Sequence, residues 1–208
     1  MSDLVWESWE YLKQGGWVMI PLGAASLWMW VLVLDRFAQY AAFTTGDIDA
    51  MSAVKALEDQ DVDTSGSGLR RMLLNRFLNE RSRDAELDRS ILHQHTLALR
   101  PKIRQHLAMI AILAAIAPLL GLLGTVLGMM ETFEVIAMFG TGNAKAMAGG
   151  ISVALVTTQA GLLVAIPGML VSGALLRRAR RMELRLDEFS HLLDRTLKHQ
   201  DPALSARS

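Results

Sequence analysis

The sequence predicts an all-α integral membrane protein with three transmembrane helices and a helical domain outside the bilayer. Three long stretches, residues 14–34, 105–130 and 146–176, contain no Asp, Glu, Lys or Arg, whereas charged residues crowd the segments around them. A helix rises about 1.5 Å per residue and crosses the roughly 30 Å hydrocarbon core in about 20 residues, so each stretch is long enough to span it. The 51% hydrophobic content of the 208-residue chain decides little by itself, and the segregation of the charges carries the prediction.

The first transmembrane helix is predicted over residues 14–40, after an outer N-terminal segment, residues 1–13. Aromatic side chains gather near its ends, as they do at membrane interfaces; they are Trp6, Trp9, Tyr11, Trp17 and Tyr40. The N-terminal residues carry acids where a signal peptide carries Lys or Arg. We therefore interpret this helix as a retained membrane anchor.

A helical domain is predicted over residues 41–104, which hold ten acidic and ten basic residues. Apolar residues such as Leu69, Leu73 and Phe77 recur at helical spacing. The pattern predicts a helical hairpin on one side of the bilayer, with a bend at Pro101.

The second and third transmembrane helices are predicted over residues 105–136 and 147–176, joined by a short link over residues 137–146. A link this short makes the two helices an antiparallel hairpin, with Gly140 to Asn143 as its turn. Beyond it, residues 177–208 are predicted to form an amphipathic helix and tail.

The distribution of Lys and Arg predicts the orientation. The outer segment and the short link each carry one such residue, whereas the middle domain carries ten and the tail eight. Basic segments stay in the cytoplasm. We therefore expect a periplasmic N-terminus, a cytoplasmic helical domain, a periplasmic link and a cytoplasmic C-terminus.

Small residues form one strip on each of the last two spans. Close approach of backbones drives helix association in lipid, so these strips predict a packing seam. The residues are Gly121, Gly124 and Gly128 on the second span and Gly150, Ala154 and Gly161 on the third.

Two threonines, Thr125 and Thr158, interrupt these strips and are the first candidates for an ion pathway. Thr157 and Gln159 add polarity beside Thr158. They lie about 200° apart on the helix wheel, so both cannot face one narrow pore, and at least one should bond to a neighbouring helix. A hydroxyl that bonds to its own helix is the plainer interpretation of a single intramembrane threonine.

None of the three span cores contains an Asp, Glu, Lys or Arg residue. A proton-driven device requires a titratable group in the membrane. If this chain conducts ions, a second protein must therefore provide the carboxylate.

Other function classes find little support. A formal net charge of zero gives no case for a nucleic-acid partner, and the absence of cysteine excludes disulfides and thiolate chemistry. His93 and His95 are two residues apart on a helix and make a poor metal pair. We predict no catalytic residue, no metal and no cofactor, and an enzyme is the least favoured class.

Charged residues at the span edges have two interpretations each. Glu131 and Glu134 could collect cations at an outer mouth, although solvation of the rim is the more ordinary role. The arginines Arg177, Arg178, Arg180 and Arg181 are expected to contact anionic headgroups or a neighbouring subunit.

The segments APLLGLLGTVLGMMETF, residues 117–133, and MAGGISVALVTTQAGLLVAIPG, residues 147–168, closely resemble the MotA/TolQ/ExbB proton-channel family. The prolines Pro118 and Pro167, the glycines, and both Thr125 and Thr158 fall at the family's positions. The arrangement in three spans and the amino-acid sequence of the third helix look most like those of ExbB-type proteins of TonB systems.

The resemblance implies a homopentameric ring in the bacterial inner membrane whose second and third helices line a pore. It implies single-span partners similar to ExbD or TolR, each with a membrane aspartate near Thr125 and Thr158. Proton passage would drive the partner, and energy would reach a TonB-like protein and an outer-membrane transporter.

Several alternatives stay open. Some family members carry Glu where this chain has Val153, so the pathway is expected to be less acidic near its outer mouth. The polar Thr157 and Gln159 keep sodium as an alternative ion. A TolQ-like role in envelope maintenance shares every residue discussed. A purely structural membrane scaffold would tolerate Thr→Val changes while losing assembly on glycine substitution.

Overall fold

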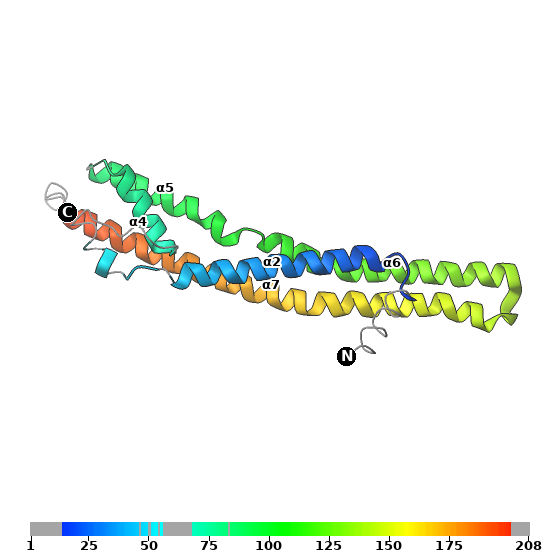
Figure 1. The fold of residues 1–208 in the computed structure, drawn as a ribbon. Coiled ribbons are helices and arrows are strands. Elements are labelled where there is room, and N and C mark those ends of the chain that lie inside the picture. The colour runs from blue at the N-terminus through cyan, green and yellow to red at the C-terminus, as the bar shows by residue number, and fades with distance from the viewer. Residues whose placement is uncertain are drawn as a thin grey trace. The chain divides into compact units, whose positions relative to one another are not determined.

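The computed structural model describes residues 14–45, 47–49, 51–53, 55, 68–82 and 84–200. The predicted outer segment 1–13, with Trp6, Trp9 and Tyr11, and the end of the tail from residue 201 lie outside the described residues. The principal elements are helical (Figure 1). They are α2 (Met19–Thr45), α4 (Leu69–Glu80), α5 (Ala85–Arg104), α6 (Leu107–Phe139), the 3₁₀ turn η1 (Gly140–Gly142) and α7 (Ala144–Gln200).

Three helical stretches of the described chain are long and apolar enough to cross a membrane. They are Met19–Thr45, Glu86–Gly142 and Ala144–Lys198. For the described residues, the predicted helical class and the prediction of three helices long and apolar enough to cross a membrane are confirmed. The first helix is shifted along the sequence, because α2 begins at Met19 rather than at the expected residue 14.

The chain divides into two compact units. Unit 1 comprises Met1–Leu34 and His106–Ala174, and unit 2 comprises Asp35–Gln105 and Leu175–Ser208. Unit 1 contains the apolar stretches, whereas unit 2 contains most of the charged residues.

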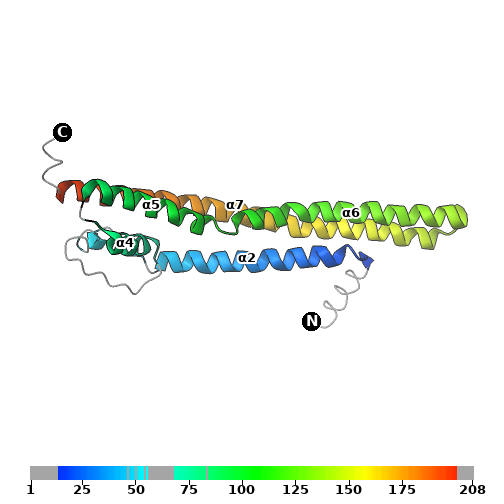
Figure 2. The ribbon, with the colours of Figure 1, turned by 90° about the horizontal axis from the view of Figure 1, so that it is seen from above.

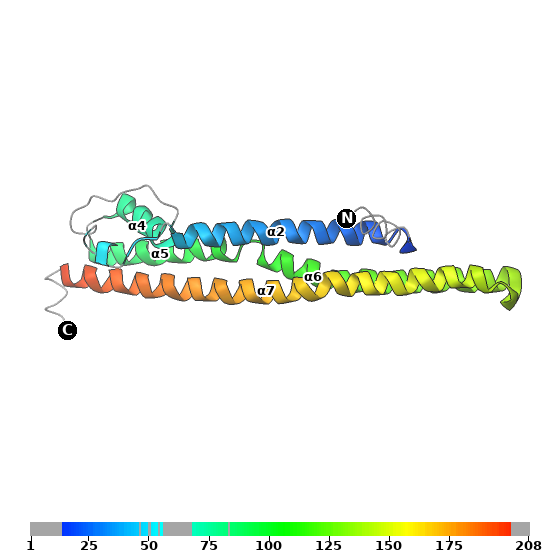
Figure 3. The ribbon, with the colours of Figure 1, turned by 60° about the horizontal axis from the view of Figure 1, so that its bottom comes forward.

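In unit 1, α6 and the first half of α7 run side by side as an antiparallel hairpin (Figure 1). In the view of Figure 3, α7 lies in front of α6. Residues of α2 pack against both helices, with Leu22, Ala117 and Ala165 buried together. Gly168 of α7 gives room to the Met29 side chain of α2. Unit 1 is therefore a three-helix bundle in which α2 covers one side of the α6–α7 hairpin.

The turn between α6 and α7 is shorter than the predicted link. The helix α6 continues to Phe139, and α7 begins at Ala144. Gly140 has φ 69°, a conformation that favours glycine, and its N–H donates to the Ile136 carbonyl at the end of α6.

In unit 2, α5 runs beside the C-terminal part of α7 (Figure 2). Residue numbers rise on α5 as they fall on α7, so the two segments are antiparallel. The pairs are Arg89–Asp194 at 3.0 Å, Arg100–Asp187 at 2.9 Å and Arg104–Glu183 at 2.6 Å. The Arg104 guanidinium donates hydrogen bonds to the Glu183 carboxylate, and this interaction raises the pKa of Arg104 above its usual value.

The α4 and α5 helices form the predicted hairpin. Asp84 caps α5 by accepting from the Glu86 N–H at 3.0 Å. His95 of α5 contacts Glu80 of α4 at 3.1 Å, while His93 is exposed, so these two histidines face different surroundings.

The structure corrects the predicted bend at Pro101. Pro101 lies in the last turn of α5, which ends at Arg104, and the next helix begins only at Leu107. Between them His106 has φ 61°, outside the helical region. The chain breaks here rather than continuing as one bent helix.

The helix predicted from residue 177 onward is the continuation of α7, which runs without a break from Ala144 to Gln200. No glycine or proline follows Gly173 within this helix, and strong helix formers such as Ala, Leu, Arg and Glu fill the segment. Leu186, Phe189 and Leu193 are buried at the expected helical spacing.

Candidate ion pathway

The two backbones of the α6–α7 hairpin meet over small residues. A Cβ atom placed on Gly128 would lie 2.5 Å from the Gly150 carbonyl oxygen, and one on Gly161 would lie 2.8 Å from the Ala117 carbonyl oxygen. Side chains larger than hydrogen cannot fit at these distances unless the backbones move apart. The small-residue strips therefore form the seam that the sequence predicts.

Thr157 lies inside this seam. Thr157 is 0% exposed. Its side chain occupies the space that is open because Gly124 of α6 has no side chain. Its hydroxyl donates to the carbonyl oxygens of Val153 at 2.9 Å and Ala154 at 3.1 Å in its own helix. The expected bond to a neighbouring helix is therefore not made by Thr157, which contacts α6 by packing.

Thr158 and Thr125 are half-buried at the flank of the seam. The Thr158 hydroxyl donates to Ala154 at 3.3 Å and lies 3.5 Å from the Gly121 carbonyl oxygen of α6. The Thr125 hydroxyl donates to Leu122 at 2.6 Å. Because Thr125 is four residues from Gly121, the two hydroxyls lie within about one helical turn of each other in height.

Both threonines lie on the side of the hairpin that α2 leaves uncovered. Leu120 and Ala160 pack against the core that includes Leu22 of α2. On the helix wheel Thr125 is about 140° from Leu120, and Thr158 is about 200° from Ala160. The two hydroxyls therefore share one open face of unit 1.

Gln159 occupies a different face. It is exposed and lines a groove between α2 and α7. Since Thr157 is buried and Gln159 is exposed, the two polar neighbours of Thr158 point in different directions, as their spacing on the helix requires.

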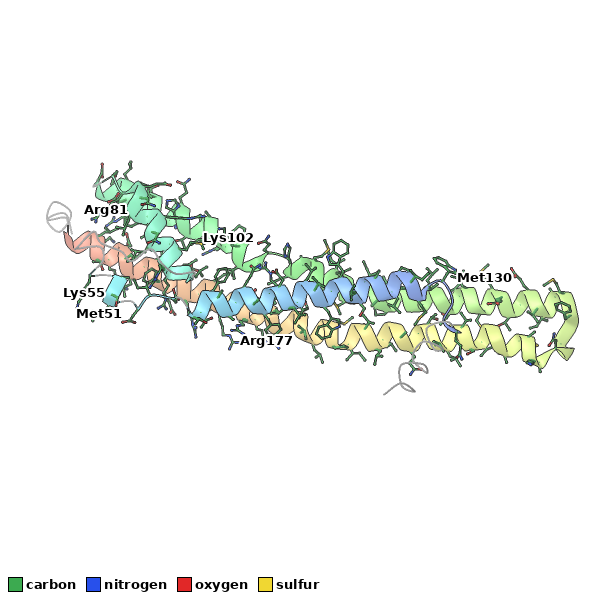
Figure 4. The ribbon with its side chains drawn as sticks, in the orientation of Figure 1. Met51, Lys55, Arg81, Lys102, Met130 and Arg177 are labelled. Carbon is green, nitrogen blue, oxygen red and sulfur yellow. The ribbon has the colours of Figure 1, made fainter. Side chains whose placement is uncertain are left out.

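The other predicted residues are placed as follows. Pro118 and Pro167 are half-buried within continuous helices. Glu131 and Glu134 are exposed on the last turns of α6, beyond Gly128, and Val153 is half-buried. Near them Met130 projects from the α6 surface with 55% exposure (Figure 4).

Thr132 is a seam residue that the sequence pattern does not single out. This residue is 3% exposed, donates its hydroxyl to the Gly128 carbonyl at 2.9 Å and packs against Gly150. Its place four residues after Gly128 continues the small-residue strip by one turn. The neighbouring Glu131 suggested the edge of the span and hid this continuation.

The four arginines at the start of the unit 2 portion of α7 differ in exposure. Arg177, Arg180 and Arg181 are exposed, and Arg177 is visible on the α7 surface in Figure 4. Arg178 is half-buried, and its guanidinium lies 5.9 Å from the centroid of the Tyr40 ring.

These features define a helical membrane protein with several spans, whose α6–α7 hairpin is packed through glycines and carries two hydroxyls on an open face. Residues 63–188 match the MotA/TolQ/ExbB proton channel family. The chain belongs to this family, whose members are channel and transport subunits and not enzymes.

Individual relatives agree with the family. The biopolymer transport protein ExbB of Neisseria meningitidis is 31% identical over 217 residues, which cover 95% of this chain and 97% of that protein. The ExbB protein of Aquifex aeolicus is 37% identical over 107 residues, 51% of this chain and 69% of that protein. The biopolymer transport protein exbB1 of Vibrio cholerae is 37% identical over 113 residues, and this match spans only 49% of its length.

Proposed function

We propose that this chain is the ion-channel, or stator, subunit of an ExbB/ExbD-type motor in the bacterial inner membrane. The motor uses the proton motive force to energise TonB-dependent transport across the outer membrane. The observation that carries the proposal is the pair of hydroxyls, Thr125 and Thr158, on the α2-free face of a glycine-packed hairpin. In a ring of several copies, five by family resemblance, these faces surround the pathway.

The proposal assigns the titratable group to a partner. The stretches 107–130 and 146–176 contain no Asp, Glu, Lys or Arg. A single-span protein of the ExbD or TolR kind, with an aspartate in its membrane helix, supplies the proton carrier. A TonB-like protein then receives the energy. Relatives named biopolymer transport protein ExbB support this branch over the TolQ-like role.

The proposal takes protons as the ion because the matching family is a proton channel family. The extra polar groups that kept sodium as an alternative, Thr157 and Gln159, lie in the seam and in the α2–α7 groove. The threonine face of each copy therefore offers only the Thr125 and Thr158 hydroxyls, and sodium stays the alternative ion. Glu131 and Glu134 stand at the outer mouth in this proposal.

The proposed orientation places the N-terminus in the periplasm and unit 2 in the cytoplasm. Arg177, Arg180 and Arg181 then lie at the inner headgroup region, where exposed basic side chains attract anionic lipids. The bilayer boundary on α7 falls between Leu176 and Arg177, where the apolar stretch ends.

Valine substitutions at Thr125 of α6 and at the adjacent Thr157 and Thr158 of α7 test the pathway. We expect Thr158→Val to reduce proton flux about tenfold or more in vesicles that contain the assembled complex, because the pathway loses a hydrogen-bonding group. Thr125→Val should act similarly. Thr157→Val should leave flux within about twofold of the unchanged protein, since the Thr157 side chain is buried against Gly124 in the seam and does not reach the open face.

Native mass measurements on each variant provide the control for assembly. A complex that assembles normally and conducts protons normally with both Thr125→Val and Thr158→Val would contradict the channel proposal and favour a structural scaffold. Replacing the proton gradient by a sodium gradient in the same vesicles decides between the two ions.

A further inference from the structure

The hydroxyls of Thr125 and Thr158 interrupt a face of unit 1 that is otherwise apolar. On α6, Thr125 is the only polar side chain among residues 118–129. On α7, Thr157 is buried in the seam and Gln159 lines the α2–α7 groove, which leaves Thr158 on the open face. The residues above and below the two hydroxyls therefore decide whether water reaches them.

One apolar pair, Met129 of α6 and Ile151 of α7, lies between the hydroxyls and the η1 turn. Met129 follows Thr125 by four residues and is about 40° from it on the helix wheel, while Ile151 precedes Thr158 by seven residues and is about 20° from it. A Cβ on the glycine before Met129 would lie 2.5 Å from the carbonyl oxygen of the glycine before Ile151, so the pair shares one level. Met129 is 40% exposed and Ile151 42%. We call them the outer pair.

A second apolar pair, Pro118 of α6 and Leu162 of α7, lies on the other side of the hydroxyls. Leu162 follows Thr158 by four residues and Pro118 precedes Thr125 by seven, so both again lie within about 40° of a threonine on the wheel. A Cβ on the glycine before Leu162 would lie 2.8 Å from the carbonyl oxygen of the residue before Pro118. Leu162 is 47% exposed, and Pro118 is half-buried. We call them the inner pair.

The two pairs enclose the hydroxyls symmetrically. Eleven residues separate the outer from the inner pair on each helix, which corresponds to about 16 Å along the hairpin. In a ring of several copies each pair repeats around the pathway and forms a collar whose side chains offer water no hydrogen bond. A hydrophobic constriction of this kind excludes water and stops ions. A path that stayed wet from end to end would let the proton gradient run down.

We infer that the outer pair, Met129 and Ile151, and the inner pair, Pro118 and Leu162, form two apolar gates that keep the hydroxyl level dry between proton transfers. The inference rests on the proposed function, because collars form only where several copies surround a pathway. The gates differ in stiffness. Methionine is unbranched and adapts its shape, so the outer gate can yield to a moving partner, whereas the proline ring fixes one side of the inner gate.

Adjacent methionines test the outer gate. Met130 is 55% exposed on the α6 surface (Figure 4) but lies about 140° from Thr125 on the wheel. The measurement is passive proton permeability after a pH jump, followed by a pH-sensitive dye in native membrane vesicles that contain the full-length chain and its natural partners. We expect Met129→Ser to raise this permeability about tenfold or more, because the new hydroxyl holds water in the constriction. Met130→Ser should change it less than about twofold, and Met129→Leu should keep the gate closed.

Adjacent leucines test the inner gate in the same vesicles. Leu163 is 75% exposed but lies about 140° from Thr158 on the wheel, on the side of the α2–α7 groove. We expect a proton leak from Leu162→Ser and none from Leu163→Ser. Native mass measurements show which variants assemble normally, and the leucine variants decide the question if Met129→Ser does not assemble.

The outcomes separate the gates from the channel. If the serine variants of each adjacent pair are equally permeable in assembled complexes, the gates are overturned, and the channel proposal stands as long as Thr158→Val still reduces driven flux. A leak from only one of the two adjacent pairs would remove the gate at the other level. If neither the serine variants nor the threonine variants change any proton flux, the channel proposal fails together with the gates.

Discussion

Gly150→Ala is expected to destabilise the α6–α7 hairpin, whereas Gly149→Ala is expected to leave it intact or slightly more stable. A Cβ at Gly150 would lie 2.5 Å from the Gly128 carbonyl oxygen and 2.9 Å from the Thr132 nitrogen. These neighbours are backbone atoms, so the two helices must separate. Overpacking of this kind costs about 1–3 kcal/mol.

The adjacent Gly149 provides the matched control. It is exposed, and a Cβ placed there meets nothing within 4 Å. Alanine at this helical position gains up to about 1 kcal/mol in helix propensity. Thermal unfolding of both purified variants in the same detergent measures the difference. Equal unfolding temperatures for Gly150→Ala and Gly149→Ala would show that α6 and α7 are not in close contact at Gly150.

The second large effect is expected at the C-terminus of α5. The last four carbonyl groups of a helix have no donor within it. Here Arg36 of α2 donates to the Lys102 carbonyl at 3.3 Å, and the Tyr40 hydroxyl donates to the Ile103 carbonyl at 2.8 Å. Both Arg36 and Tyr40 are 0% exposed. The two side chains of α2 thus cap α5 where the chain leaves the helix.

Arg36→Leu should lower the stability of unit 2 by about 1–3 kcal/mol, because a buried carbonyl loses its donor. Asp35, which contacts Arg36 at 3.2 Å, loses a partner as well. Tyr40→Phe removes only the hydroxyl and should cost about 1 kcal/mol. Chemical denaturation of the purified chain, followed by circular dichroism, measures both losses.

Lys102→Ala is the control for the cap. Lys102 is exposed and contributes its backbone carbonyl to the contact with Arg36, so its side chain is dispensable (Figure 4). We expect this variant to unfold like the unchanged protein. A destabilisation by Lys102→Ala as large as that of Arg36→Leu would mean that general surface charge, and not the cap, stabilises this end of α5.

Sequence patterns were sufficient to locate the three transmembrane helices, because the bilayer imposes a simple rule. A charge-free stretch of about 20 residues must be a helix when water is absent, whatever it packs against. The same local rule located the glycine strips and the hairpin, since residues three and four apart share one helix face. The break at His106 and the continuous α7 were not predictable in this way, because hydrophobicity does not report a single left-handed residue.

The sequence by itself determined the class of this protein: three apolar helices, two threonines on small-residue strips, and no titratable group at depth. Only the tertiary structure decided which polar residue serves which surface. Thr157, Thr158 and Gln159 are consecutive, and helical geometry sends them in three directions, but their surroundings depend on where α2 and α6 pack. Thr157 became part of the seam, Thr158 part of the open face and Gln159 part of the groove, because burial is a property of neighbouring helices and not of the sequence around a residue.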